Sequence, residues 1–226
     1  MEQEGAPLPG RRHTALQTPI EGLRATLPAE LPFLANAQVR SFILERPQGN
    51  VIVYNSPGLS EAADEIRALG DVTRLMLNHG HEAMYGPPQL DVPVFVHERD
   101  RAETASSLRV SGTFTRRQMI DDDLEVIPIP GHTSGTTCYL WDSGTHQFLF
   151  TGDSLWVEHG EWKAVVLGSS DRAASLDSLR LISELDFDVL VPWAAMTGEP
   201  AVHTVDREDA RTRIDAVIAR VAAGGH

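Results

Sequence analysis

Two histidines in close succession are the first sign of chemistry in this sequence. His79 and His81 follow the apolar run 72–77, which is typical of a strand ending near residue 78. Alternate side chains of a strand project to the same face, so both imidazoles can converge on one metal ion. Pairs of this spacing also arise by chance, and most histidines lie on the surface or pack in the core. The pair therefore needs further ligands before it predicts a metal site.

Two later segments offer those ligands. His132 lies in a glycine-bounded loop directly after a predicted strand, and Asp153 follows the apolar run 147–150 and Gly152. An imidazole and a hard oxygen donor would thus be presented at strand ends. In the alternative interpretation His132 only orders its own loop by hydrogen bonding, and Asp153 only caps a turn with Ser154. Together with the histidine pair, the two residues predict a metal centre.

Short apolar runs and amphipathic stretches predict the elements that position these residues. Strands are expected near residues 39–44, 51–54, 72–77, 94–96, 124–129, 136–141, 147–150 and 188–191, and helices over about 60–70, 173–185 and 207–221. The first two strands should form a hairpin through the turn at 46–50, and Ser60 should cap the first helix. Strands mixed with peripheral helices predict sheets covered by helices.

The domain organisation is expected to be simple. Residues 1–31 are rich in proline, glycine and charge and show little periodicity, which predicts an extended N-terminal arm. Residues 32–226 are then a single domain, a size common for one α/β unit.

Composition disfavours several partners. With 32 acidic and 19 basic side chains the net charge is −13, which would repel nucleic acids and anionic lipid surfaces. The single cysteine, Cys138, lies in an apolar run and is expected to be a core thiol. The chain shows neither a long apolar run typical of a membrane span nor, in the acidic segment 1–7, the basic start of a signal peptide. A cytoplasmic location is therefore expected.

These segments, in this order, resemble the metallo-beta-lactamase superfamily, which includes glyoxalase II, lactonases and sulfur dioxygenases. The resemblance runs from about residue 39 to residue 191. It is carried by Asn55-Ser56-Pro57-Gly58, Asn78-His79-Gly80-His81, Val96-His97-Glu98, the loop from Pro130 to Thr136, and Gly152-Asp153. It implies an α/β fold, a four-layer αββα sandwich with the site at one edge of its two sheets. It also assigns His79, His81, His132 and Asp153 to the first metal position.

The departures from the family pattern fall on the second metal position. The family motif continues His-x-His-x-Asp-His, and here its last two places are Ala83 and Met84. The family's late histidine is also missing, because the chain reads Pro192-Trp193-Ala194 there. The resemblance thus leaves only Asp153 for a second ion.

The residues around the vacated position are expected to form a pocket rather than a ligand set. The replacements are apolar, so they predict a hydrophobic wall to which Trp156 and Trp193 also contribute. Glu82 is out of phase with His81, and His203 lies beyond the motif, so neither is expected to substitute for a lost ligand. His97 is expected to support the site or pack beside it.

The resemblance and the four ligands favour a mononuclear, metal-dependent hydrolase. We expect one Zn²⁺ per chain, because three neutral imidazoles on zinc lower the pKa of a bound water to about 7. Asp153 is then a catalytic residue that adds a ligand or holds the attacking water. The expected partner is a small molecule: an ester, lactone or thioester.

Two other functions stay open. His79, His132 and Asp153 match the two-histidine, one-carboxylate set that binds Fe²⁺ in oxygenases, and sulfur dioxygenases of the superfamily bind iron in that manner. The second open function is that of a catalytically silent binding or regulatory protein, since an incomplete site does not establish an activity.

Overall fold

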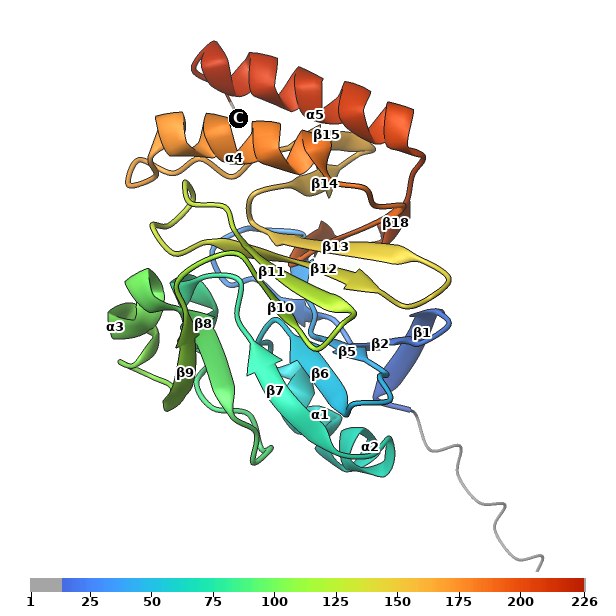
Figure 1. The fold of residues 1–226 in the computed structure, drawn as a ribbon. Helices are drawn as coiled ribbons and strands as arrows, with labels where there is room; N and C mark the ends of the chain where they lie inside the picture. Colours follow the sequence, from blue (N-terminus) through green and yellow to red (C-terminus); the bar gives the residue numbers. More distant parts are fainter. Residues whose placement is uncertain (1–13, 226) are drawn as a thin grey trace, which may run out of the picture.

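Three β-sheets form the frame of the computed structural model, which describes residues 14–225 (Figure 1). The first sheet contains β1 (Leu16–Ile20), β2 (Leu23–Thr26), β5 (Phe42–Leu44), β6 (Asn50–Val53), β7 (Val72–Met76), β8 (Val94–His97) and β9 (Val110–Phe114), in that spatial order. Its strands are antiparallel from β1 to β6 and parallel from β6 to β9.

The second sheet contains β10 (Gln118–Ile120), β11 (Leu124–Pro128), β12 (Thr137–Asp142), β13 (Gln147–Gly152), β16 (Val189–Pro192) and β18 (His203–Thr204). The third and smallest sheet is formed by β15 (Glu161–Lys163), β14 (Trp156–Glu158), β17 (Ala194–Met196), β4 (Ala37–Val39) and β3 (Ala29–Glu30). Strands β13 and β16 are parallel neighbours, so their carboxyl ends lie at one edge of the second sheet.

Helices lie outside both large sheets. In Figure 1, α4 (Arg172–Glu184) and α5 (Arg207–Ala222) cover the outer side of the second sheet, whereas α1 (Gly58–Glu61), α2 (Ala63–Ala68) and α3 (Arg101–Thr104) lie on the side of the first sheet. Two short 3₁₀ helices, η1 (Gly80–Tyr85) and η2 (Glu98–Asp100), follow β7 and β8. The layers are thus αββα, as predicted. No helix within residues 14–225 combines the length and apolar character needed to cross a bilayer.

Three apolar clusters fill the three interfaces between these layers. Phe42, Tyr54 and Phe150 belong to the cluster between the two large sheets, where their rings meet edge to face with centroids 6.1 Å apart. Leu190 of β16 lies in the cluster that joins the second sheet to α4 and α5, and Ile66 of α2 lies in the cluster under the first sheet. Each fully buried side chain of this size contributes about 1.5–3 kcal/mol by its removal from water.

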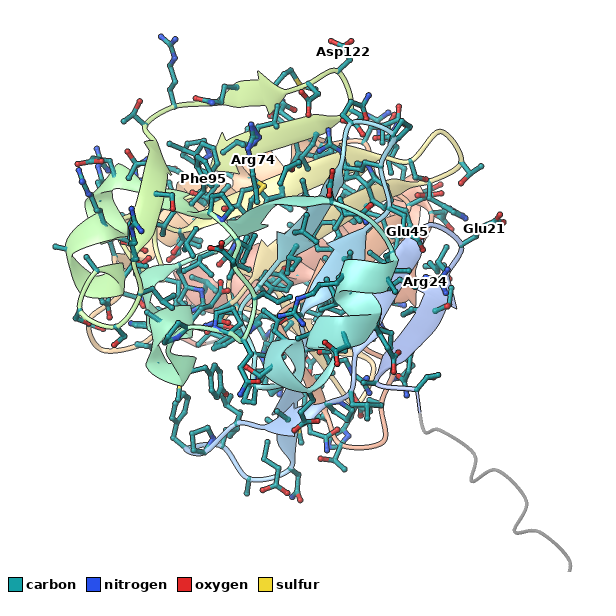
Figure 2. All side chains as sticks on the ribbon, turned by 90° about the horizontal axis from the view of Figure 1, so that it is seen from below. Glu21, Arg24, Glu45, Arg74, Phe95 and Asp122 are labelled. Carbon is teal, nitrogen blue, oxygen red and sulfur yellow. The ribbon has the colours of Figure 1, made fainter. Side chains whose placement is uncertain are left out.

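Polar pairs add smaller contributions across neighbouring strands. Arg24 on β2 forms an ion pair with Glu45, just after β5, and the Arg74 guanidinium on β7 lies 5.3 Å from the ring centre of Phe95 on β8 (Figure 2). Contacts of this kind contribute about 0.2–1 kcal/mol each.

The two long helices begin where side-chain caps are available. Asp171 accepts a hydrogen bond from the Ala174 amide before α4, and Asp206 accepts one from the Asp209 amide before α5. Both predicted helices are therefore found within about one residue of their expected ends. The hairpin of β5 and β6 is also confirmed.

Other expectations differ from the structure. The predicted helix at 60–70 is two short helices, and Ser60 does not cap it, because α1 begins after Pro57 without a side-chain cap. The expected arm contains β1, β2 and β3, which are hydrogen-bonded into the sheets, while its first 13 residues lie outside the described part. β1 is an edge strand that is mostly exposed, so its sequence lacks the alternation of a buried strand.

Candidate metal centre

The three predicted histidines converge at the edge of the two large sheets. His79 is the N-cap residue of η1, His81 lies within η1, and His132 lies in the loop after β11. One nitrogen of each ring lies within 4.8 Å of those of the other two. The local structure differs from the prediction: β7 ends at Met76, and a tight 3₁₀ turn, not a strand face, brings His79 and His81 together with ring centres 5.0 Å apart.

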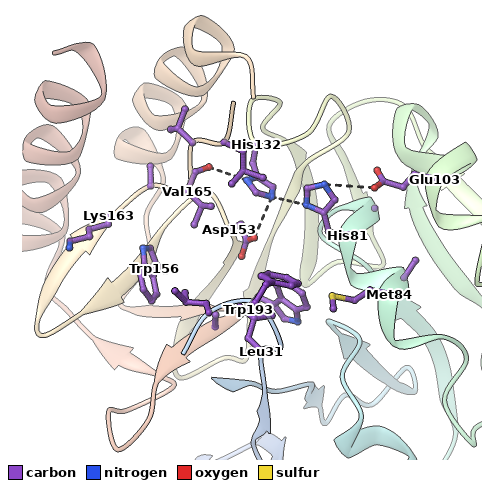
Figure 3. A pocket seen from close by; sticks show the side chains of 18 of the residues that line it. Leu31, His81, Met84, Glu103, His132, Asp153, Trp156, Lys163, Val165 and Trp193 are labelled. Atoms are coloured by element: carbon purple, nitrogen blue, oxygen red, sulfur yellow. Dashed lines mark hydrogen bonds and ion pairs between the residues drawn. The ribbon is translucent and has the colours of Figure 1, made fainter. Parts of the chain in front are cut away.

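Hydrogen bonds at the opposite ring nitrogens orient His132 and His79, and a carboxylate faces the outer nitrogen of His81. His132 Nδ1 lies 3.0 Å from the Val165 carbonyl oxygen, so Nδ1 carries the proton and Nε2 faces the cluster (Figure 3). His132 Nε2 lies 3.0 Å from His81 Nδ1, and His81 Nε2 faces Glu103 Oε1 at 3.7 Å. His79 Nδ1 lies 3.1 Å from Asn78 Oδ1. Each ring therefore offers one nitrogen to the same point.

His79 Nε2 provides the test of whether these residues fit a metal. This atom is buried and has no hydrogen-bond partner within residues 14–225. Leaving such a group unpaired costs about 1–3 kcal/mol. Burial lowers the pKa of His79 to about 3, so the ring is neutral, which is the form that ligates metals. The orphaned nitrogen and the three-imidazole donor set fit a borderline cation such as zinc.

Asp153 lies beside this cluster. Its Oδ2 is 3.3 Å from His132 Nε2 (Figure 3). The same oxygen is 3.6 Å from His79 Nε2, although only the three histidines among the described residues form the compact group. Gly152 permits this position, since its φ is +55° and a Cβ there would lie 1.9 Å from Asn78 Oδ1. The carboxylate is thus placed either to bind a metal ion directly or to contact a water bound to that ion.

Asp100 holds the two histidine-bearing loops together. This buried residue of η2 accepts hydrogen bonds from the Gly80 amide at 3.0 Å, the Gly135 amide at 2.8 Å and the Thr133 hydroxyl at 2.5 Å. Gly80 separates the paired histidines, and Thr133 follows His132. The sequence alone does not indicate this role, because an acidic residue after a strand carries no signal of its distant partners.

Glu82 fixes the backbone around His79. It is fully buried, and its carboxyl group accepts hydrogen bonds from the amides of Asn55 at 2.8 Å, Asn78 at 2.7 Å and His79 at 3.3 Å. Burial outweighs these bonds and raises the pKa of Glu82 to about 8. Its Oε1 also lies 3.4 Å from His79 Nδ1. Glu82 therefore lies behind the cluster, on the side of His79 opposite to the shared point.

The residues to which the resemblance gives the second metal position are apolar and lie near the cluster or the cavity. Ala83 is buried in the cluster under the first sheet, whereas Met84 is 43% exposed and faces a cavity. Trp193 is buried with its ring centre 5.2 Å from that of His79, and its Nε1 donates to the Asn55 carbonyl oxygen at 3.2 Å. Ala194 follows it in β17 and also lines the cavity.

Two further histidines lie away from the cluster. His203 is on β18 and does not line the cavity, and burial lowers its pKa. His97 ends β8, and its Nδ1 accepts a hydrogen bond from the Arg99 amide at 3.2 Å. It thereby shapes the turn that leads to Asp100.

A cavity of about 840 Å³ opens onto the histidines. His81, His132 and Asp153 lie at its base, and Trp156 and Trp193 are part of its wall (Figure 3). The remaining lining is largely apolar and includes Leu31, Phe33, Leu34, Val165, Val166 and Leu167. Cavities of this size accommodate small molecules.

Comparisons with known proteins agree with this architecture. The model of a family described as the metallo-beta-lactamase superfamily matches residues 76–194, more than half of the chain and including all four predicted ligands. Comparison with curated proteins finds no match.

Solved structures are similar over most of the chain. A metallo-beta-lactamase from Pontibacter korlensis has a TM-score of 0.67 and 14% identity, covering 92% of this chain and 98% of its own. A metallo-beta-lactamase family protein from Thermus thermophilus has a TM-score of 0.60 and 19% identity, covering 90% of this chain and 80% of its own. The metallo-beta-lactamase GOB-18 from Elizabethkingia meningoseptica has a TM-score of 0.59 and 13% identity, covering 99% of this chain and 97% of its own. At these identities the likeness shows the fold.

Proposed function

The chain belongs to the metallo-beta-lactamase superfamily, and from that premise we propose that it is a hydrolase working with one zinc ion held by His79, His81 and His132. The observation that carries the proposal is the convergence of three oriented imidazoles on one point, with His79 Nε2 buried and unpartnered within residues 14–225. The substrate class is a small ester, lactone or thioester, because such carbonyl compounds suit attack by an activated water.

The chemistry divides between the ion and the chain. A bound zinc ion supplies Lewis acidity and lowers the pKa of a coordinated water to about 7. Asp153 Oδ2 lies beside two ligand nitrogens at the base of the cavity, so it can accept a proton from the attacking water. Val165 and Asn78 keep His132 and His79 in orientation by hydrogen bonds to their outer nitrogens, and Glu103 faces the outer nitrogen of His81 at 3.7 Å.

A single ion is proposed because the second position lacks donors. Of the residues that the family motif would use there, Ala83 and Ala194 have no ligating atom, and the Met84 thioether suits soft metals. Trp193 adds an indole that already donates its only N–H to Asn55.

Metal content of the purified, untagged protein tests the proposal. We expect about one zinc per chain, a large loss in His132→Ala, and hydrolysis of at least one class in a panel of esters, lactones and thioesters. Asp153→Ala should retain more zinc than His132→Ala but lose activity. Two ions per chain would contradict the single-metal proposal. A zinc-loaded protein inert towards the whole panel would favour the silent-scaffold alternative.

An iron oxygenase is the second candidate, favoured by one observation. Asp153 Oδ2 lies close to both His79 Nε2 and His132 Nε2, so two imidazoles and a carboxylate adjoin one another. Iron in the purified protein and oxygen consumption with glutathione persulfide would support this candidate, and zinc with no oxygen consumption would reject it.

A further inference from the structure

The charged side chains that line the cavity are mostly acidic. Glu103, Asp153 and Glu158 contribute carboxylates, whereas Lys163 is the single lysine or arginine in the lining within residues 14–225. The Asp153 and Glu158 side chains are only 15% and 27% exposed, so water screens their charges incompletely. A zinc ion held by the histidines would add positive charge beside Asp153 and Glu103 at the base of the cavity. Away from the base, Lys163 is the one lysine or arginine among the described lining residues, so an anionic group there would meet Glu158 with little positive charge to offset it.

Lys163 is not available to offset this imbalance. Its ammonium group forms an ion pair with Glu158 and lies 4.0 Å from Glu161 Oε2. Both partners belong to the hairpin of β14 and β15, in which Glu158 and Glu161 face each other across the turn. A substrate carboxylate could reach Lys163 only by displacing Glu158 and remaining beside it, an arrangement that like charges make unfavourable.

Exposed apolar side chains gather around the same cavity. Five large hydrophobic residues are exposed in the described chain, and all but Met119 line this cavity: Phe33, Leu34, Met84 and Leu167. Phe33 alone is 69% exposed. Apolar residues concentrated around one opening indicate a binding surface, because scattered exposed residues would show no such grouping. The group that occupies this surface should be apolar.

We propose that the site selects uncharged substrates that carry an apolar acyl or aryl group, and that the Glu158–Lys163 pair makes it discriminate against the same compounds bearing a carboxylate. The proposal rests on the proposed function for the identity of the reacting group. The new element is how the chain recognises the rest of the substrate.

Binding of two matched amides to the zinc-supplemented protein tests the proposal without turnover. The para-nitroanilides of valeric acid and of glutaric acid differ only in a terminal methyl group or carboxylate. By calorimetry the neutral anilide should bind about tenfold more tightly than the anionic one. Equal affinities, tighter binding of the anionic compound, or no binding of either would overturn the proposal.

Variants test the ion pair itself. Glu158→Gln should release Lys163 and strengthen binding of the anionic anilide about tenfold, and adding Lys163→Met should abolish that gain. Glu125→Gln is the matched control, because Glu125 pairs with Arg117 outside the cavity and is similarly exposed, at 20%. An unchanged preference in Glu158→Gln would overturn the role of the pair.

The two proposals fail in different ways. The para-nitrophenyl esters of the same acids report hydrolysis, whereas the anilides report recognition. A preserved preference for the neutral anilide with no ester hydrolysis would reject the proposed hydrolase alone. Ester hydrolysis with no charge preference in either assay would reject the selectivity alone.

Discussion

The three clustered imidazoles depend on residues that do not themselves face the point that the rings share. Val165 fixes His132 through a backbone carbonyl, which any residue at that position would supply. Glu82 acts through its side chain, since it gathers the amides of Asn55, Asn78 and His79 around one buried carboxyl group. The position of His79 is thus more sensitive to the side chain at 82 than the position of His132 is to the side chain at 165.

Glu82→Gln should weaken zinc binding about 10- to 100-fold, because the amide cannot accept all the hydrogen bonds that two carboxyl oxygens accept. Competition with a chromogenic chelator measures this affinity. Glu98→Gln is a suitable control, since the Glu98 side chain is 47% exposed in the neighbouring 3₁₀ helix. Wild-type affinity in Glu82→Gln would show that the carboxyl group does not support the site.

Residue type and order were enough to predict that His79, His81 and His132 would meet, whereas the residues behind them were not predictable. His79, His81, His132 and Asp153 each follow an apolar run, so the end of a sheet was the expected meeting place. The spacing of Glu82 does not match that of a ligand, and nothing in the sequence indicates the hydrogen bonds that its carboxyl group accepts from three amides. Asp100 depends on contacts with residues more than thirty positions away in the chain.

At the scale of elements, the site is a junction of loops at the ends of β7, β8, β11 and β13. Asp100 joins η1 to the loop after β11, and Gly152 allows the end of β13 to touch Asn78 at the end of β7. These contacts fix the relative positions of loops that belong to different sheets. Substitutions that disturb them should affect the metal and the fold together.

Asp100→Asn should destabilise the protein by about 1–3 kcal/mol, because the buried side-chain amide cannot accept hydrogen bonds from all three donors. Amide hydrogen exchange of Gly80 and Gly135 should accelerate in the variant, and urea unfolding measures the change in stability. Asp142→Asn is the control, since Asp142 accepts the Gly144 amide in an exposed turn. Unchanged exchange at both glycines would contradict the bridging role of Asp100.

Gly152→Ala should cost about 3 kcal/mol or more, because the added Cβ collides with Asn78 in addition to adopting an unfavourable φ. Gly144→Ala isolates the second effect: its φ is +85° and no atom lies within 4 Å of a Cβ built there. That control should lose only about 1 kcal/mol in the same urea measurement. Similar losses in the two variants would show that the contact with Asn78 relaxes freely.

Elements with a clear period and many buried residues were predictable, and short peripheral ones were not. α5 buries Ala210, Ile214, Val217 and Val221 along one face, and the central strands β12 and β13 are largely buried. By contrast β14, β15 and β17 have three residues each, too few for a period to appear. These three strands nevertheless carry Trp156, Glu158, Lys163 and Ala194 of the cavity lining, so its charge pattern could not be predicted.

At the scale of the whole molecule, polar contacts connect the two large sheets at both ends of the apolar interface. Near the site, the Tyr54 hydroxyl donates to the Val191 carbonyl oxygen at 2.7 Å and accepts from the Gly152 amide at 2.8 Å. Elsewhere the Arg46 guanidinium, on the turn between β5 and β6, forms ion pairs with Asp121 and Asp123 on the turn between β10 and β11. Each contact restrains how one sheet lies on the other.

The Arg46–Asp123 pair should make stability depend on pH. Burial alone would raise the pKa of Asp123, but the hydrogen bonds and charge of Arg46 lower it below its ordinary value of 3.8. A carboxyl group with a depressed pKa in the folded state stabilises the fold above its ordinary pKa, and that contribution is lost as the pH falls towards the folded value. The Arg46 side chain is 1% exposed, so removing its partner charge is costly.

Asp123→Asn should therefore be less stable than the wild type by about 1–3 kcal/mol at about pH 7, and the difference should shrink below about pH 4. Urea unfolding of both proteins at a series of pH values measures the gap, and metal release in acid affects both proteins alike. Asp177→Asn, which removes an ion pair whose side chains are 58% and 79% exposed, should show almost no gap at any pH. If the Asp123→Asn gap stayed constant into acid, the destabilisation would come from lost packing or geometry at the turn, and the charge of Asp123 would not be what joins the two sheets there.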